Sequence, residues 1–279
     1  TYSSSVMEAK LLCPNGFSIS IMTEWIINDP DNIKNNKQDC EQKAFSRLSK
    51  KLKAALPQLS ICILADGLYP NDTIFNICKN NNWDYIFTFK DGNLKSVWEE
   101  IASRKKDKQT IDIEYIGIED SKRCDYSGFY CNNLPYKENI LHVLETNVKN
   151  DTDIPSRFVH VTNIEINSTN FKEISRTGRL RWKIENEGFN EQKNGGYNVC
   201  HKFVHKSHDT SCNYYQCLQI AHIINQLNTL SVEFKKRLNA NANESVKSLL
   251  EFAISALFHT DFDMVIIQSI LEKNCQFRY

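Results

Sequence analysis

Two carboxylates stand where the sequence could support metal chemistry. The first, Asp66, follows a nearly continuous apolar run, Leu59–Ala65, and precedes a glycine. The run predicts a central strand that is buried on both faces, and α/β sheets bind ligands beyond the carboxyl ends of such strands. An aspartate at this position can bind a divalent cation. It can equally form a turn or cap a helix, because its side chain accepts hydrogen bonds from backbone N–H groups.

The second carboxylate, Glu185, belongs to the segment 178–190. On a helix, Arg181 and Glu185 lie four residues apart and share one face, so a guanidinium and a carboxylate can pair there. Trp182 and Phe189 lie seven residues apart on a neighbouring face, where they predict a hydrophobic anchor for the helix. The alternative is an exposed helix with an ordinary ion pair, because such pairs are common and stabilise little.

The elements that must position these carboxylates follow from hydrophobic patterning. Val6–Leu12 and Phe17–Met22 predict two strands joined by a turn that contains Asn-Gly. The following residues alternate between helix and strand, an order that is typical of an α/β fold. The predicted helices cover 37–56, 71–80 and 94–104, and the strands cover 59–65 and 85–89.

The second half of the chain has a different pattern. Residues 105–157 predict a β-rich insertion, with strands at 111–116 and 140–148 separated by a polar stretch. One more strand is expected at 158–166. From residue 170 the pattern becomes helical, with predicted helices over 170–194, 212–238, 244–258 and 261–273.

Together, the two carboxylate segments resemble a known family. Residues Arg179–Glu185, RLRWKIE, resemble the third acidic motif of the DDE transposases of bacterial insertion sequences. Extended to Asn190, the string is similar to a subgroup with an I-E-N-E-x-F-N pattern. Leu64–Tyr69, LADGLY, resembles the second Asp motif of that subgroup, and Lys37–Glu41 before the helix at Ala44–Leu48 is also similar. The resemblance covers about residues 2–230.

The resemblance implies a fold and a set of boundaries. The fold is an α/β, RNase H-like core, a mixed sheet with flanking helices, that carries a β-rich insertion and a helical C-terminal part. Residues 1–104 would form the first part of the core and 105–157 the insertion. Residues 158–210 would form the second part, with the helix of the third carboxylate, and 211–279 the helical C-terminal region.

The resemblance also implies a reaction. In the family, three carboxylates hold two Mg²⁺ or Mn²⁺ ions, which activate the attacking water or 3′-hydroxyl and stabilise the leaving oxygen. Asp66 and Glu185 correspond to the second and third carboxylates, with Glu187 as a competitor for the third. Arg181 would orient Glu185 or contact a phosphate. The implied activity is cleavage of transposon ends and strand transfer into target DNA, by a homodimer assembled on paired ends.

Contacts with DNA are implied for four cations, Arg179, Lys183, Lys193 and His205. Lys193 follows Glu185 by eight residues, close to the family's usual spacing of about seven. Residues 171–206 hold eight Lys and Arg against four Asp and Glu, a local positive excess that fits phosphate contacts. A solvated helix face would have the same charges.

Two departures from the family pattern matter. Gly178 stands where the family usually has a tyrosine. The first catalytic Asp is also missing, because the strand that carries it precedes the hairpin at 6–22; we expect it upstream of Thr1, in a chain that is truncated at its N-terminus. Asp29, Asp31 and Asp39 follow the hairpin and are poor replacements. The alternative is a catalytically inactive remnant that binds DNA or a partner.

The amino-acid composition excludes several classes of protein. The 279 residues carry 34 Lys and Arg and 34 Asp and Glu, which excludes a strongly basic nucleic-acid coat and an acidic disordered chain. The longest apolar runs are shorter than the roughly 20 residues of a membrane span, so we expect no membrane partner.

The ten cysteines are scattered without a C-x-x-C pair, which favours reduced thiols in a cytoplasm. The family resemblance implies that this is a bacterial-type cytoplasm, with the protein at the nucleoid. A rival prediction is a zinc-stabilised binding module. Its potential ligands crowd one segment and are Cys200, His201, His205, His208, Cys212 and Cys217.

Overall fold

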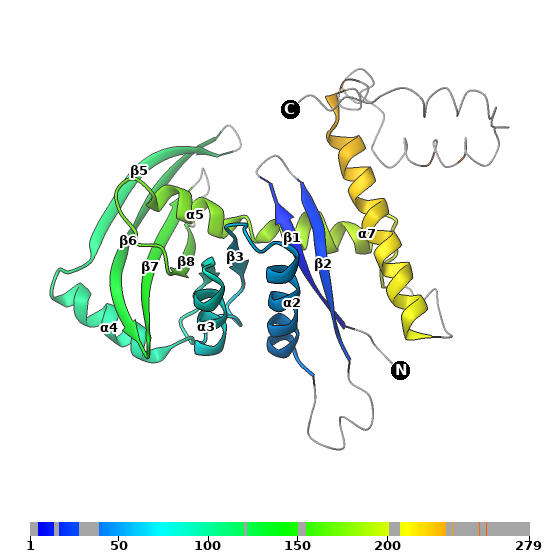
Figure 1. Cartoon of the computed structure of the whole chain (residues 1–279). Helices are drawn as coiled ribbons and strands as arrows, with labels where there is room; N and C mark the ends of the chain where they lie inside the picture. Colours follow the sequence, from blue (N-terminus) through cyan, green and yellow to red (C-terminus); the bar gives the residue numbers. More distant parts are fainter. Residues whose placement is uncertain are drawn as a thin grey trace. The chain divides into compact units, whose positions relative to one another are not determined.

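The computed structural model describes residues 5–13, 17–27, 39–119, 122–149, 155–200 and 207–232, with the single residues 236, 251 and 255 (Figure 1). The chain divides into two compact units, residues 1–194 and 195–279, and each is described by itself. Within these described ranges, no helix combines the length and the apolar character that crossing a membrane requires.

The first unit begins with an antiparallel hairpin that forms a sheet of its own. β1 (Ser5–Leu12) pairs with β2 (Ser18–Ile26), and the register shifts between Ala9 and Lys10. Both predicted strands are confirmed, although β2 extends four residues further than expected. The turn between them lies outside the described residues.

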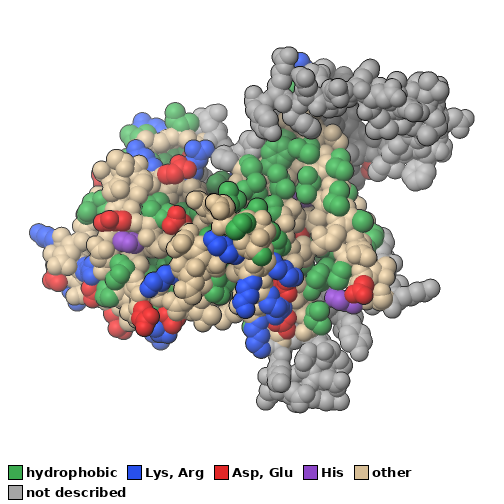
Figure 2. All heavy atoms as spheres, in the orientation of Figure 1, with side chains coloured by type: hydrophobic (Ala, Val, Ile, Leu, Met, Phe, Trp, Pro, Cys, Tyr) green, Lys and Arg blue, Asp and Glu red, His purple; other side chains and the backbone are tan. Residues whose placement is uncertain are grey.

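α2 (Glu41–Ala55) packs against this hairpin (Figure 1). Its buried face carries Ala44, Phe45, Leu48 and Leu52, at the spacing of one helix stripe. The opposite face is basic: Lys43, Lys50 and Lys51 are exposed, and Figure 2 shows Lys and Arg side chains gathered over this helix. The helix predicted over 37–56 is confirmed for the part that is described.

Ion pairs join α2 to β2. The Arg47 guanidinium donates to Glu24 at 2.6 Å, to Asp39 at 2.7 Å and to the carbonyl of Trp25 at 3.0 Å. The Lys51 ammonium lies 2.5 Å from the second oxygen of Glu24. Burial raises the pKa of Glu24, but hydrogen bonds from Arg47 and Lys51 outweigh it and leave the pKa below its usual value.

A six-stranded mixed sheet forms the body of the unit. Its strand order is β3-β4-β8-β7-β6-β5, in which β3 and β4 are parallel and the other neighbours are antiparallel. The strands are β3 (Cys62–Ala65), β4 (Asp84–Thr88), β5 (Ile111–Glu119), β6 (Lys122–Tyr136), β7 (Asn139–Lys149) and β8 (Ser156–Thr162). The protein is therefore a mixed α/β protein.

The prediction of a central strand at 59–65 is wrong in position. β3 is the edge strand of the six, and only Ala65 is buried within it, while Cys62 is exposed. An apolar run indicates that side chains are covered, but it does not say how many strands flank the backbone. Here Ile63 and Leu64 are only partly buried, against the two hydrophobic clusters of the sheet, and a neighbouring strand pairs with one side of β3 only.

The predicted insertion forms the far half of this same sheet. β5, β6 and β7 continue from β8, so the sequence boundaries at 104/105 and 157/158 do not coincide with a break between sheets. The polar stretch expected between two strands is itself β6, a strand of 15 residues. In its first part, Cys124 and Tyr126 are buried and alternate with exposed polar residues, but a register shift between Cys131 and Leu134 breaks this period.

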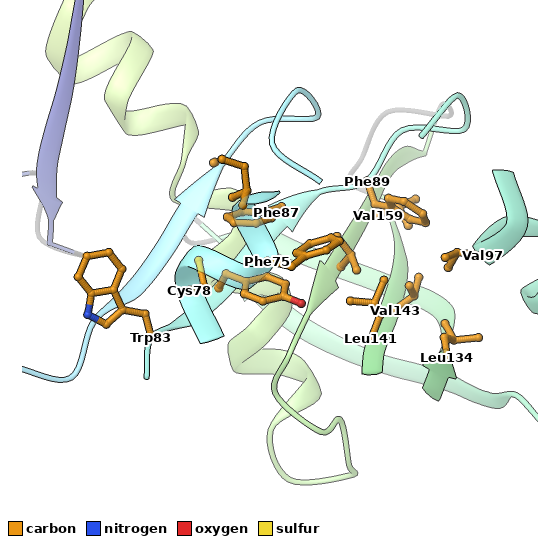
Figure 3. Packing of buried hydrophobic residues seen from close by; sticks show 14 of the residues in the cluster. Phe75, Cys78, Trp83, Phe87, Phe89, Val97, Leu134, Leu141, Val143 and Val159 are labelled. Atoms are coloured by element: carbon orange, nitrogen blue, oxygen red, sulfur yellow. The ribbon is translucent and has the colours of Figure 1, made fainter. Parts of the chain in front are cut away.

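Helices cover both faces of the six-stranded sheet. Adjacent residues of a strand point to opposite faces; Phe87 packs with α3 (Asp72–Asn81) and α4 (Lys95–Lys106), whereas Ile86 packs with α5 (Phe171–Arg179). On the first face, Phe75 stacks on Tyr85 at a centroid distance of 5.1 Å, and Tyr85 stacks on Phe87 at 4.7 Å. Figure 3 shows this aromatic layer beside Leu141 and Val143 of β7.

The helix predicted over 170–194 is interrupted. α5 ends at Arg179, a π-helical segment η1 (Ile184–Asn190) follows, and α6 (Glu191–Asn194) closes the unit. In the second unit, α7 (His208–Leu230) corresponds to the helix predicted over 212–238 and begins four residues earlier than predicted. The helices predicted over 244–258 and 261–273 lie outside the described residues, apart from two isolated positions.

Phe75→Ala tests the aromatic layer. Phe75 is 1% exposed, so its truncation leaves a cavity among Tyr85, Phe87 and Tyr136. We expect the free energy of unfolding to fall by about 3–5 kcal/mol in urea denaturation. The control is Ile118→Ala, because Ile118 is 79% exposed and its loss should cost about 0.5 kcal/mol or less. Equal losses in the two variants would contradict this packing.

Candidate functional site: a cleft between two strand edges

A cleft of about 590 Å³ lies within the first unit, between β1 and β3. Its walls come from α2 on one side and from α5 and η1 on the other. Asp66 and Glu185, the two carboxylates singled out from the sequence, both line it. The fold thus brings together two residues that lie far apart along the chain.

Asp66 leaves the end of β3 in a tight turn. Its Oδ1 accepts a hydrogen bond from the backbone N–H of Leu68 at 2.9 Å, and its carbonyl accepts one from Tyr69 at 3.2 Å. The next residue, Gly67, is held by Asn93, whose side-chain amide donates to the Gly67 carbonyl at 2.9 Å. Asp66 therefore stabilises the turn with one carboxylate oxygen, and the other, Oδ2, remains for a ligand.

Glu185 occupies the first turn of η1. Arg181 Nη1 donates to Glu185 Oε1 at 2.6 Å, the i,i+4 pair that the sequence predicts. The Arg181 side chain is 15% exposed and that of Glu185 is 51% exposed. The buried guanidinium thus fixes one carboxylate oxygen and leaves the other toward the cleft and solvent.

The π-helical turn brings Glu185 close to the hairpin. A π-turn adds one residue to a helical turn and occurs often at functional sites. Here it buries Gly188, where a Cβ would lie 3.2 Å from Lys10 Cε of β1, and it places the Phe189 ring 5.3 Å from Lys10 Nζ. Phe189 is thus the hydrophobic anchor; Trp182, expected to share that role, is 52% exposed.

Sequence reasoning missed three charged residues that line the cleft. Glu8 and Lys10 of β1 form an ion pair at 2.8 Å with fully buried side chains. Their i,i+2 spacing on a strand was the available signal. Glu41, the first residue of α2, also lines the cleft, and its charge together with burial raises the pKa of Tyr69.

The predicted DNA-contacting cations have different surroundings. Lys193 is exposed and lines a small hollow together with Glu185. Lys183 pairs with Glu187 at 3.0 Å, so this competing carboxylate has a cation of its own. Arg179 forms an ion pair with Glu119 of β5, which lowers the pKa of that carboxyl. His205 lies outside the described residues.

The Arg179 guanidinium also lies over two aromatic rings, those of Phe158 at 5.3 Å and Tyr126 at 5.8 Å. Its side chain is 18% exposed. A phosphate would have to compete with Glu119 for this cation, whereas Lys193 stands open to solvent. Of these two residues predicted to contact DNA, Arg179 is thus held in an ion pair inside the fold, whereas Lys193 is accessible to a phosphate.

Packing against His160 explains why position 178 is a glycine. A Cβ at this position would lie 2.5 Å from the ring of His160, so no larger side chain fits the native arrangement. The His160 ring is 3% exposed, and burial, with the charges of Arg179 and Arg181, lowers its pKa to about 4. A neutral histidine ring thus takes the space that a side chain at position 178 would need.

Two carboxylates of the cleft are candidate metal ligands. Mg²⁺ prefers carboxylate oxygens, and Asp66 and Glu185 each offer one. Across the described ranges, no three or more His, Cys, Asp or Glu side chains come close enough to hold one ion. For the rival zinc site, Cys212 Sγ lies 3.4 Å from His208 Nε2 on α7, while His201 and His205 fall outside those ranges.

Comparisons with known proteins add no family. No model of a protein family matches the chain, and no curated protein matches its sequence.

The buried His160 makes stability depend on pH. Its folded pKa of about 4 lies below the unfolded value of about 6.5, so the unfolded state binds more protons between these values. Stability is then complete above pH 6.5 and is lost as the pH falls toward 4. We expect this residue to remove about 2 kcal/mol between pH 7 and pH 5.

Urea denaturation of the wild type and of His160→Gln at both pH values measures this loss. Gln is polar and does not titrate, so the variant should lose less free energy of unfolding between pH 7 and pH 5. The same measurement on His142→Gln shows how much of the pH dependence comes from His142, because burial also lowers the pKa of this histidine. Equal pH dependence in the wild type and His160→Gln would refute the assignment.

Proposed function

We propose that the chain carries two of the carboxylates of a metal-dependent phosphoryl-transfer site that acts on DNA, in an RNase H-like core of the DDE transposase type. The observation that carries the proposal is that Asp66 and Glu185 line one cleft. Each was singled out by a separate motif, and a shared metal site requires that both line one cavity.

The donor set fits a hard divalent cation. Asp66 and Glu185 would hold Mg²⁺ or Mn²⁺ through the oxygens that the turn and Arg181 leave unused. When bound, such ions activate the attacking oxygen and stabilise the leaving oxygen of a phosphodiester. Glu185 is favoured over Glu187, because it lines the cleft while Glu187 is paired with Lys183.

The chain's own residues would orient the site and bind the nucleic acid. Arg181 holds the Glu185 carboxylate in one rotamer, which makes it a positioning residue. Lys193 stands beside Glu185 on the surface, where its charge would attract a phosphate. In this proposal the substrates are transposon ends and target DNA, and the acting species is a homodimer on DNA.

A second candidate is a catalytically inactive remnant that binds DNA or a partner. Glu8 and Glu41 line the cleft as well, but among the described residues no three His, Cys, Asp or Glu side chains come close enough to hold one metal ion, and this observation favours it. Such a protein would bind DNA through the same cations without cutting it.

Metal titration with DNA cleavage tests the first candidate. We expect Asp66→Asn and Glu185→Gln each to weaken Mn²⁺ binding about tenfold or more, measured by calorimetry. The matched control is Glu187→Gln, which removes a neighbouring carboxylate outside the cleft. The cleavage assay uses the chain extended upstream to its natural start codon, and Mn²⁺-dependent nicking of duplex DNA that both variants lose supports catalysis. DNA binding without nicking supports the remnant, and neither metal nor DNA binding overturns both.

Lys193→Gln tests the phosphate contact. We expect weaker binding to duplex DNA of any sequence, and a salt dependence whose slope falls by about 1. Lys106→Gln is the control, because Lys106 is equally exposed at the end of α4, away from the cleft. Equal effects of the two substitutions in a fluorescence-anisotropy titration would remove Lys193 from the interface.

A further inference from the structure

The two faces of β1 carry different side chains. Met7 packs in the hydrophobic cluster with α2, whereas Glu8 and Lys10 lie on the opposite face, because successive residues of a strand alternate between its faces. On that second face the hairpin meets η1. A Cβ at Gly188 would lie 3.2 Å from Lys10 Cε, and Lys10 Nζ lies 5.3 Å from the centre of the Phe189 ring. Lys10 is therefore the side chain of β1 that contacts the π-turn.

The charge of Lys10 is balanced out of solvent. Its ammonium lies 2.8 Å from Glu8 Oε2, and both side chains are 0% exposed. Both residues belong to one strand, so the pair by itself joins no two elements. The cost of removing two charges from water also offsets most of their attraction. What the pair does for the fold therefore depends on what else the ammonium touches, and that is the Phe189 ring, whose attraction for a cation is stronger in the absence of water.

A bulge in the hairpin supports this buried pair. Met22 lies opposite Ala9. The next residue, Lys10, lies opposite Ser20, so β2 carries one extra residue, Ile21, at this point. Residues opposite each other in an antiparallel pair share a face. The bulge thus places a serine instead of an isoleucine beside the charges, and the Ser20 hydroxyl donates to the Glu8 carboxylate at 2.9 Å.

We propose that Lys10 is a positioning residue for Glu185. Its ammonium, neutralised by Glu8, holds η1 against the hairpin and thereby sets where the Glu185 carboxylate stands in the cleft. Arg181 fixes the rotamer of this carboxylate, whereas Lys10 fixes the backbone segment that carries it. These contacts lie within the first unit and need no ligand in the cleft. The consequence for metal binding rests on the proposed function, but the contact with η1 does not.

Amide hydrogen exchange tests whether the ammonium holds η1. The double variant Glu8→Gln, Lys10→Met keeps the side-chain volumes and leaves no unpaired carboxylate buried. We expect the amides of residues 184–190 to exchange about tenfold or more faster than in the wild type, while those of α3 keep their rates. Unchanged exchange in η1 would overturn the proposal, because the apolar stem of residue 10 would then suffice.

Phe189→Leu tests the same contact with both charges in place. The variant keeps an apolar side chain and removes the ring, so that only the attraction between the ammonium and the ring is lost. We expect exchange in η1 to become about two- to fivefold faster, the change that corresponds to a cation–π contact. Equal rates in Phe189→Leu and the wild type would contradict the role of the ammonium.

Mn²⁺ titration by calorimetry tests whether Lys10 acts through Glu185. We expect the double variant to bind Mn²⁺ about fivefold more weakly or worse in the wild-type background. In the Glu185→Gln background, where the positioned carboxylate is gone, the same change should cost less than about twofold. Equal losses in the two backgrounds would indicate a general disturbance of the site and would overturn the positioning role.

Lys51→Met is the control for the titration, because Lys51 pairs with Glu24 on the side of the hairpin that faces α2. Its Mn²⁺ affinity should equal that of the wild type, and a loss as large as that of the double variant would count against Lys10. A wild type that binds no Mn²⁺ would overturn the proposed metal site. The exchange of η1 would then decide by itself whether Lys10 holds the π-turn.

Discussion

The hairpin β1–β2 shares no ladder of backbone hydrogen bonds with the six-stranded sheet in the described part of the chain. Side chains must therefore hold the two sheets in place. α2 does this from one side, with its apolar stripe and with Arg47 bound to Glu24. η1 does it from the other side, where Gly188 allows close contact with Lys10. The cleft exists because these helices join the sheets while their edges remain apart.

The candidate chemistry depends on the same arrangement. Asp66 belongs to the six-stranded sheet, whereas Glu185 sits on the π-turn that packs on the hairpin. Their distance is consequently controlled by the contacts that hold the two sheets.

Patterns of local origin were predicted well. The hairpin, α2, α3, β4, α4, β7 and β8 all follow from apolar spacing and turn residues, because these signals act between near neighbours. The long strand β6 was missed, since polar residues obscured its alternation. The continuous helix after residue 170 was also wrong. The helical segments on the two sides of the break pack on different partners, since Gly178 of α5 contacts His160 and Gly188 of η1 contacts Lys10 of the hairpin.

The sequence by itself determined most of the elements, β6 and the break after α5 excepted, and it determined local pairs such as Arg181–Glu185. Only the tertiary structure decided which of these residues meet. In the tertiary structure, β3 is an edge strand and Arg179 forms an ion pair with Glu119. Asp66 and Glu185 both line one cleft. The physical reason is that helix and turn formation depend on residues a few positions apart. Strand order and edge pairing, in contrast, depend on contacts between distant segments, which no local spacing encodes.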